Sequence, residues 1–478
     1  MCSINHLDKR RGKNKMAFAK AIEALKNAET FIFSPSVTNE EAIILQKIRE
    51  KTGINLVCHE ARSYQKFMQA YTEVSGKSFY MGSLQALSNS EVIITIGTRI
   101  KDDSPLEAKH IEMTSKSANA KVIYMHSLED ARFQDIITQF IKYEVASEVA
   151  VIALLIEGLL DATKVPKSVS AFLADLDIGN LSAESSVGEE EIEDLKRLLL
   201  NVQSKTLVIG ADLYSHPQSK QIAQMLALLE VYADFNVICI PCALNTIGVA
   251  TICDLSDNAE GKSIGYNVSA NFTLSSLGEG DLTMPTINQR DGSIINIDKY
   301  VVAMKSKLSY DGYTLNDIAC ALGINKEHIV AHTKQLAKNK GFELYELDDF
   351  PEYYDNLGSR HKAYPLKILS VFVKIELEDI GDIDGIYGAV IYNCNASLPS
   401  SELGTSLLGS QQFATATKLK DGDIITYVLD DIRFNREFNI DKSLKGTIAL
   451  NPTFDMGLES ALLRSYRFSS LDFEKVGK

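Results

Sequence analysis

The sequence predicts an α/β protein with two units built on parallel sheets and a C-terminal β-rich domain. Between residues 16 and 240, apolar runs rich in Val and Ile alternate with helical segments, which is typical of parallel sheets covered on both faces. From about Leu366 onwards, apolar residues alternate in short runs separated by turns, which indicates a small barrel-like domain. The length of 478 residues allows about two to four domains, each able to bury a core.

The first predicted α/β unit spans residues 16–163, after a basic N-terminal segment at 1–15. Its best-marked helix begins at Thr38, because a threonine N-cap followed three residues later by Glu41 forms a capping box. The other predicted elements alternate between strand and helix. They are the helix Lys20–Asn27, the strands Thr30–Phe33, Ile54–Cys58, Glu91–Ile96 and Ala120–Tyr124, and the helices Asp102–Ser117 and Phe140–Ala162.

Residues 164–198 are predicted to be a linker and the start of a helix, in which the acidic run Glu189–Asp194 forms the first turn. A second α/β unit at 199–345 follows, with an Asp291-Gly292 hairpin turn. Its other elements are the strands Thr206–Gly210 and Asn236–Ile240 and the helices Pro217–Leu229, Thr314–Leu322 and Lys326–Lys338. An acidic linker at 346–365 leads to the β-rich domain at 366–478.

Charge and hydropathy narrow the function classes. The chain has 63 acidic and 49 basic residues, and its net charge of −14 argues against a general nucleic-acid binder. The longest apolar run, Val149–Leu160, contains Glu157 and is shorter than the roughly 20 residues of a membrane span. No apolar segment follows the basic N-terminus, so we expect a cytoplasmic protein without a secretory signal.

The seven cysteines argue against a disulfide framework or a four-cysteine cluster. They are widely spaced, apart from Cys239 and Cys242, which have C-x-x-C spacing. That pair is either a redox or metal-binding dithiol or, because Cys239 lies in an apolar strand, structural. His328 and His332 are one helical turn apart, but no third ligand is spaced to complete a metal site. The sequence therefore indicates no catalytic residue and no metal site.

Two strands share an ending that is a weak candidate for ligand binding. Both Ile93–Gly97 and Thr206–Gly210 end in glycine before a polar turn and a helix. A glycine at such a strand end allows the backbone to approach a phosphate, although it is also a common feature of tight turns. Neither copy has the G-x-G-x-x-G fingerprint or a P-loop.

Three stretches resemble known families. Residues 239–248, CIPCALNTIG, resemble the strand and Asn-x-x-Gly turn of molybdopterin oxidoreductases. Residues 284–302 and 310–319 are similar to a hairpin and its following helix in the large iron-sulfur subunit of respiratory complex I. Asn288 fits that pattern, whereas Arg290 stands where the family has Glu. Further likeness lies at residues 34–42, 82–84, 96–99 and 445–454.

The resemblance implies two Rossmann-like units of the molybdopterin oxidoreductase type and a C-terminal barrel-like domain. It also implies a scaffold subunit of a proton-pumping NADH-quinone oxidoreductase, contacting the other hydrophilic-arm subunits at the inner membrane. The N-terminal cluster-binding region of the large iron-sulfur subunit is expected to be absent, with Cys2 a remnant at most. No cofactor is then expected in this chain, and iron-sulfur clusters would belong to a partner or to the missing region.

Two other functions stay open. The chain could be a molybdopterin-dependent oxidoreductase, in which Gly97, Gly210 and Asn245 would hold the pterin dinucleotide. It could also be an α/β protein with an unrelated binding role. The sequence supports the fold more firmly than any site chemistry.

Overall fold

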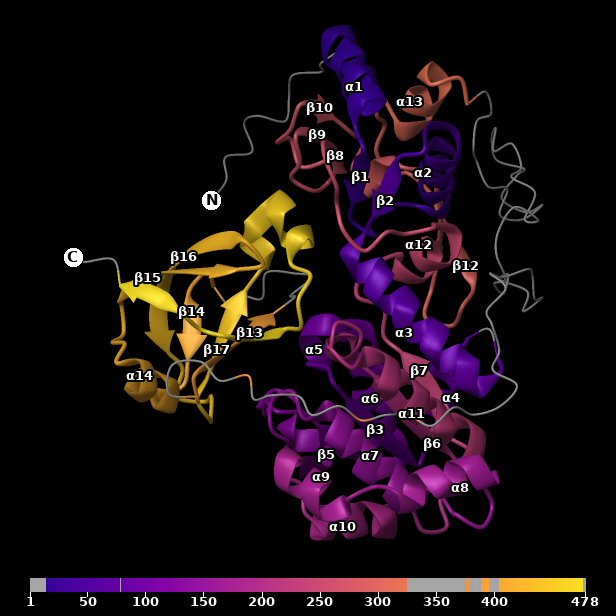
Figure 1. Ribbon diagram of the computed structural model, residues 1–478, viewed down its shortest axis with the longest axis vertical. Coiled ribbons are helices and arrows are strands. Elements are labelled where there is room, and N and C mark those ends of the chain that lie inside the picture. The colour runs from indigo at the N-terminus through magenta and orange to yellow at the C-terminus, as the bar shows by residue number, and fades with distance from the viewer. Residues whose placement is uncertain are drawn as a thin grey trace. The chain divides into compact units, whose positions relative to one another are not determined.

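The computed structural model describes residues 14–77, 79–324, 375, 377, 383, 388–394 and 404–475 (Figure 1). The predicted helix Lys326–Lys338 with His328 and His332, the linker at 346–365 and Cys2 lie outside these residues. The chain forms two compact units. The first lies within residues 1–62, 243–364 and 457–462, and the second within 63–242, 365–456 and 463–478. Each unit is thus assembled from separate stretches, unlike the consecutive ranges 16–163 and 199–345 of the sequence prediction.

Sheet A belongs to the first unit and has five parallel strands in the order β10-β9-β8-β1-β2. Its strands are β1 (Thr30–Phe33), β2 (Asn55–Val57), β8 (Ser263–Tyr266), β9 (Phe272–Ser275) and β10 (Leu282–Thr283). The helices of this unit are α1 (Lys15–Asn27), α2 (Asn39–Thr52), α12 (Thr246–Ile252) and α13 (Leu315–Ala321). The predicted capping box is confirmed, because the Glu41 N–H donates to Thr38 Oγ1 at 3.2 Å and the Thr38 N–H donates to Glu41 Oε2 at 3.0 Å.

Sheet B belongs to the second unit and has five parallel strands in the order β5-β4-β3-β6-β7. Its strands are β3 (Val92–Ile96), β4 (Lys121–Met125), β5 (Ile137–Ile141), β6 (Lys205–Ile209) and β7 (Asn236–Cys239). The accompanying helices are α4 (Leu84–Ser88), α5 (Ile100–Asp103), α6 (Pro105–Ala118), α7 (Glu148–Leu159), α8 (Lys167–Ala174), α9 (Ile178–Ser185), α10 (Glu189–Leu199) and α11 (Ser219–Tyr232). Helix α3 (His59–Ser75) runs across the boundary between the units in the sequence.

Two predicted elements are wrong in detail. The helix Phe140–Ala162 is instead strand β5 followed by α7, because Ile137–Ile141 pairs with β4 and Ala146 adopts a left-handed conformation before the helix begins. The hairpin does not turn at Asp291-Gly292. Gly292 begins β11 (Gly292–Ile295), which pairs with β12 (Val301–Met304), and the chain reverses at Asn296–Tyr300.

The β-rich C-terminal domain is confirmed as a curled, seven-stranded mixed sheet in the order β18-β13-β17-β14-β16-β15-β19 (Figure 1). Its strands are β13 (Val390–Cys394), β14 (Leu407–Gly409), β15 (Ile424–Leu429), β16 (Ile432–Ile440), β17 (Ile448–Pro452), β18 (Phe468–Ser470) and β19 (Phe473–Lys475), and its helix is α14 (Gln411–Thr417). Phe413, Tyr427 and Phe438 lie in its buried apolar core. Apart from residues 457–462, this domain belongs to the second unit.

None of the helices in the described part of the chain is long and apolar enough to span a membrane.

Candidate functional site

Each parallel sheet has one place where the strand order reverses, and such switch points are where ligands bind in open α/β sheets. In sheet B the chain moves outwards from β3 to β4 and β5, and then from β6 to β7 on the other side. In sheet A the reversal lies between β1 and β8. A site is therefore expected at the carboxyl ends of these strand pairs.

The sheet B switch point brings together two of the three candidate residues. Gly97 ends β3 and Gly210 ends β6, and the Gly210 N–H donates to the Ile96 carbonyl at 2.8 Å. Gly97 has a φ of +65°, and a Cβ on it would lie 2.6 Å from Leu213 Cγ. A Cβ on Gly210 would lie 2.0 Å from the Gly97 carbonyl oxygen. The direction in which a Cβ of either glycine would point is thus occupied by the protein itself.

A buried ionic cluster lies next to these glycines. Asp212, two residues after Gly210, accepts from Arg467 Nη1 at 2.9 Å, and Tyr392 hydroxyl donates to it at 3.2 Å. His126 Nδ1 accepts the Leu128 N–H at 2.9 Å, so its Nε2 carries the proton and donates to Asp212 at 3.1 Å. The other Arg467 nitrogen, Nη2, donates to Asp103 at 2.7 Å. We call Asp212, His126, Tyr392, Arg467 and Asp103 the Asp212 cluster.

The electrostatics of the Asp212 cluster keep both Asp212 and Arg467 charged. Burial favours the neutral form of Asp212, but Arg467 and His126 outweigh it, and the pKa of the carboxyl lies below its ordinary value. Burial by itself would lower the pKa of Arg467, whereas Asp103 and Asp212 hold it well above the ordinary value. Arg467 and Tyr392 come from the C-terminal domain, so the cluster joins that domain to sheet B as a paired, hydrogen-bonded core.

A second histidine lies beside a buried carboxylate, but its Nε2 hydrogen-bonds to the Ala146 carbonyl at 3.3 Å, and Glu148 Oε2 has no hydrogen-bond partner. The Gln218 N–H donates to His216 Nδ1 at 3.0 Å, and His216 Nε2 lies 3.3 Å from Glu148 Oε2. Tyr466 donates a hydrogen bond to the other oxygen of Glu148. All three side chains are buried. Two tyrosines of the C-terminal domain, Tyr392 and Tyr466, therefore each bind a carboxylate that also contacts a histidine of the α/β part.

The third candidate residue, Asn245, lies in the first unit, at the switch point of sheet A. Its Nδ2 donates to the Val37 carbonyl at 2.9 Å and to Asn39 Oδ1 at 3.0 Å, and its Oδ1 accepts the Ile295 N–H at 3.0 Å. Its side chain is fully buried. Asn245 therefore connects the loop after β1 to strand β11, and its hydrogen-bonding groups are used within the protein.

Two glutamates at the start of α2 complete this network. Glu40 accepts from the Ser293 N–H at 2.8 Å and from the Ser293 hydroxyl at 3.0 Å. Glu41 accepts from Arg290 Nη1 at 2.6 Å and from the Tyr266 hydroxyl at 2.7 Å. The presence of Arg290 thus has a structural reason, since its charge neutralises Glu41 at a buried helix N-terminus. Burial alone would lower the pKa of Arg290, but Glu41 and Tyr266 keep it above its ordinary value.

The cysteines do not belong to a metal centre within the described residues. In that part of the chain, no group of three or more His, Cys, Asp or Glu side chains is placed to hold a metal ion. Cys239 is buried at the end of β7, and Cys242 is partly exposed. Cys394 is buried beside Arg99, and burial raises the pKa of its thiol to about 12. A thiol with such a pKa is a poor nucleophile and a poor ligand at neutral pH.

The three loops that the sequence offered for a pterin dinucleotide are tightly packed within their own units. A Cβ on Gly97 would meet Leu213, and a Cβ on Gly210 would meet Thr98. The Asn245 side chain forms hydrogen bonds with backbone and side-chain groups. Gly248, in the Asn-x-x-Gly turn, would place a Cβ 2.1 Å from Asn39 Oδ1.

Sequence reasoning missed most of the residues in these networks. Asp212 and His126 had a local signal, since each follows the carboxyl end of a predicted strand, where functional polar groups gather. Arg467 and Tyr392 had no local signal. They lie about 180 or more positions after Asp212, and no short sequence pattern connects residues so far apart.

Comparisons with known proteins bear on the fold. No family model and no curated protein sequence matches the chain. Among solved structures, acetylene hydratase from Pelobacter acetylenicus is similar, with a TM-score of 0.64 and 10% identity over 95% of this chain and 85% of that one. The formyltransferase/hydrolase complex from Methylorubrum extorquens, solved with methylofuran, gives a TM-score of 0.43 and 12% identity over 66% of this chain and 98% of that one.

The first similarity confirms the fold class, which is two Rossmann-like units of the molybdopterin oxidoreductase type with a C-terminal β-rich, barrel-like domain. The resemblance to the large iron-sulfur subunit of complex I is wrong, because nothing in these comparisons points to that subunit, whereas the fold is similar to that of acetylene hydratase. The hairpin that suggested this resemblance is a short β11–β12 pair. Arg290, which precedes it, forms an ion pair with Glu41.

One titratable group outside the clusters gives a pH-dependent prediction. Glu60, in the first turn of α3, has a buried carboxylate oxygen without a hydrogen-bond partner, and burial raises its pKa to about 7 from the ordinary 4.5. Between these values the folded protein keeps a proton that the unfolded chain releases, so the stability falls as pH rises from about 4.5 to about 7. We expect Glu60→Gln to leave stability unchanged at pH 4 and to raise it by about 2 kcal/mol at pH 8.

The measurement is the free energy of unfolding of both proteins across this pH range. Glu23→Gln on α1, where the side chain is exposed, is the control and is expected to show no such trend. A difference between Glu60→Gln and the wild type that does not change with pH would show that the burial of Glu60 is not the cause.

Proposed function

We propose that this chain is a non-catalytic scaffold subunit of an oxidoreductase assembly, which positions electron-transfer proteins without itself holding molybdenum, pterin or an iron-sulfur cluster. The observation that carries the proposal is that hydrogen-bonded side chains of the chain itself gather at both switch points. At sheet B these are the residues of the Asp212 cluster, and at sheet A they are Asn245, Glu40 and Glu41. A catalytic relative of the same fold would need open space at such places.

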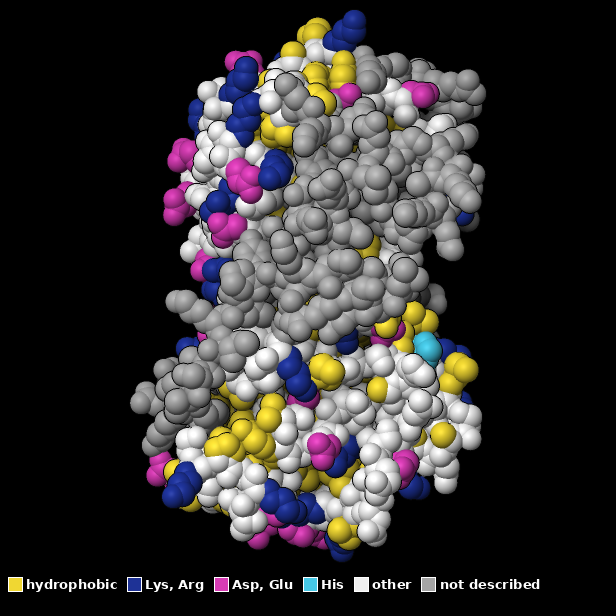
Figure 2. All heavy atoms as spheres, turned by 90° about the vertical axis from the view of Figure 1, so that its right-hand side faces the viewer, with side chains coloured by type: hydrophobic (Ala, Val, Ile, Leu, Met, Phe, Trp, Pro, Cys, Tyr) yellow, Lys and Arg dark blue, Asp and Glu magenta, His cyan; other side chains and the backbone are white. Residues whose placement is uncertain are grey.

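The expected partners are other protein subunits. The described part of the surface in Figure 2 has Lys and Arg side chains interspersed with Asp and Glu, without a basic face of the kind that tracks a phosphate backbone. The net charge of −14 agrees with this view. Any association with a membrane would then come through those partners.

A molybdopterin-dependent oxidoreductase is the alternative, and the fold likeness to acetylene hydratase is the observation that favours it. In that case the loops at Gly97, Gly210 and Asn245 would have to open to admit the dinucleotide. That opening would break the Asn245 hydrogen bonds to Val37 and Asn39.

Cofactor content distinguishes the two functions. The full chain, produced in a host that makes the molybdenum cofactor, is analysed for molybdenum, tungsten and iron by mass spectrometry and for pterin by fluorescence after oxidation. We expect each to be far below one per chain. Molybdenum or tungsten together with pterin at one per chain would overturn the scaffold function in favour of the alternative.

Partner binding tests the rest of the proposal. The tagged chain, expressed at its natural level, is isolated and the flavin and iron of the co-purifying proteins are measured. We expect a stoichiometric complex with at least one cofactor-bearing subunit. A chain that stays free of such subunits after mild cross-linking would leave the scaffold function without support.

A further inference from the structure

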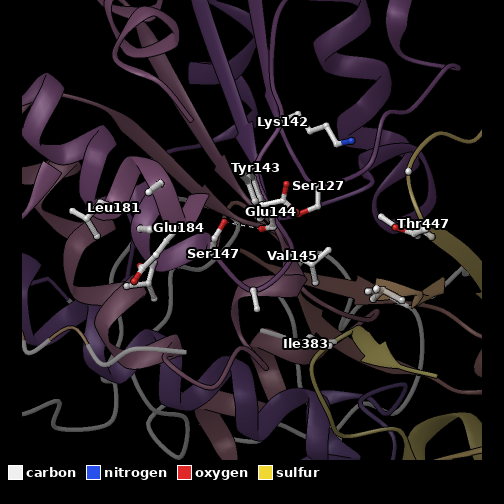
Figure 3. A pocket seen from close by; sticks show the side chains of 18 of the residues that line it. Ser127, Lys142, Tyr143, Glu144, Val145, Ser147, Leu181, Glu184, Ile383 and Thr447 are labelled. Atoms are coloured by element: carbon white, nitrogen blue, oxygen red, sulfur yellow. Dashed lines mark hydrogen bonds between the residues drawn. The ribbon is translucent and has the colours of Figure 1, made fainter. Parts of the chain in front are cut away.

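A cavity of about 590 Å³ lies in the second unit, at the carboxyl ends of strands β4 and β5 (Figure 3). Ser127 follows β4, and residues Lys142 to Ser147 connect β5 to α7. Val390 and Ile448, at the start of β13 and β17 in the C-terminal domain, also line it. Its volume is in the range of small-molecule sites, and its location is where parallel sheets place their ligands. The switch-point networks described above do not account for it.

The N-terminus of helix α7 faces this cavity without a cap. Val149 and Ala150, in its first turn, line the cavity, and their N–H groups have no acceptor within the helix. The Ser147 hydroxyl donates to the Glu144 carbonyl at 2.7 Å and does not cap the helix. The Glu148 carboxylate is turned to Tyr466 and His216. The partial positive charge of this helix end is therefore left for a ligand.

Ser127 provides a second, independent indication of a ligand. Its side chain is only 2% exposed and lines the cavity, where it is labelled in Figure 3. Its hydroxyl has no hydrogen-bond partner. Buried hydroxyls are almost always hydrogen-bonded, so an unpaired one on a cavity wall indicates a group that binds there.

The remaining lining defines the chemistry of that group. Lys142 supplies a positive charge, whereas Glu144 and Glu184 supply two exposed carboxylates. Two carboxylates would repel a phosphate or a nucleotide, but they suit an ammonium group. The side chains of Leu181, Val390 and Ile448 form an apolar part of the wall. The cavity thus offers donors for an anion, acceptors for a cation and an apolar surface.

We propose that this cavity binds a free α-amino acid with an apolar side chain. Its carboxylate would accept hydrogen bonds from the first turn of α7 and from the Ser127 hydroxyl and pair with Lys142. Its ammonium group would face Glu144 and Glu184, and its side chain would contact Leu181. The proposal does not depend on the scaffold function, because neither switch point takes part in it.

Calorimetric titration of the full-length protein tests the ligand class. L-Leucine is the probe, compared with 4-methylpentanoate, which lacks the amino group, 3-methylbutylamine, which lacks the carboxylate, and inorganic phosphate. We expect leucine to bind at least tenfold more tightly than each of the other three. Equal binding of 4-methylpentanoate would overturn the role of the glutamates. Binding of phosphate alone, or no leucine binding at millimolar concentration, would overturn the proposal.

Variants test the location. Ser127→Ala and Lys142→Met are each expected to weaken leucine binding at least fivefold while leaving the circular dichroism spectrum unchanged. Ser117→Ala and Lys164→Met, which alter exposed residues outside the cavity, are the matched controls and are expected to bind leucine as the wild type does. Leucine binding that is unaffected by both Ser127→Ala and Lys142→Met would place the ligand elsewhere and overturn the proposal.

Discussion

Asp212→Asn is expected to lower the free energy of unfolding of the second unit by about 3–5 kcal/mol, because it leaves a buried guanidinium short of its counter-charge. Asp212 accepts hydrogen bonds from Arg467, His126 and Tyr392, and all of these side chains are buried or nearly so. Asparagine has the same shape but no charge, and its amide group would face donors. Asp103 remains to pair with Arg467, which keeps the loss from being larger.

Denaturant unfolding monitored by hydrogen exchange distinguishes this loss of stability in the second unit from changes in the first unit. The expected result is faster exchange in β3, β6 and β13 and no change in sheet A. Asp431→Asn, at a carboxylate that is 95% exposed, is the control and is expected to behave as the wild type. Equal stability of Asp212→Asn and wild type would show that the ionic cluster does not stabilise this unit.

The effect of Asp212→Asn also has a defined pH dependence. The folded-state pKa of Asp212 is below that of the unfolded chain, so its contribution is present above the unfolded pKa and is lost as pH falls through the folded pKa. The stability difference between the variant and the wild type should therefore be constant near neutral pH and decrease in acid. A difference that grows in acid would contradict the assignment of a charged Asp212.

Arg290→Met is expected to cost the first unit about 3–5 kcal/mol, since it leaves the buried Glu41 carboxylate without its cation. Arg290 Nη1 is 2.6 Å from Glu41 Oε2, and Nη1 and Nε also donate to the Ser36 and Pro285 carbonyls. Glu41 is at the same time the capping-box residue of α2, so an unpaired or protonated Glu41 also weakens the start of that helix.

Thermal unfolding of a double-mutant cycle measures this pair. Glu41→Gln combined with Arg290→Met should cost less than the sum of the single changes, because neither charge is then left alone. Arg62→Met removes an exposed ion pair with Asp257 and is the control, for which we expect a loss of at most about 1 kcal/mol. Additive single losses would mean that Glu41 and Arg290 do not interact.

The parts of the fold that could be predicted from the sequence are those with a local cause. The capping box at Thr38 and Glu41 needs only four consecutive residues, and the glycines that end β3 and β6 follow directly from two apolar runs. Strand β5 was missed because Ile137–Ile141 includes the polar Thr138 and Gln139 and shows no clear strand alternation, so that only its pairing with β4 marks it as a strand.

The site was less predictable than the fold, because its contacts join distant parts of the chain. Gly97 and Gly210 follow β3 and β6, and Asn245 precedes α12, but the surroundings of these residues depend on Leu213, Asn39 and the C-terminal domain. Whether the space beside a glycine is open depends on tertiary packing. No local pattern shows that Arg467 binds Asp212 from 255 positions further along the chain.

The pairing of β1 with β8 has a consequence for the nascent chain. Thr30 pairs with Ser263. After β1 and β2 have been synthesised, the ribosome must therefore add more than about 200 residues before β8 can complete sheet A. At about 5–20 residues per second this takes at least about 10 s, during which the apolar edge of β1 needs protection from aggregation. Sheet B, which lies wholly within residues 92–239, can form in that interval. We therefore expect the ribosome-bound chain to acquire protease resistance in its middle before its beginning.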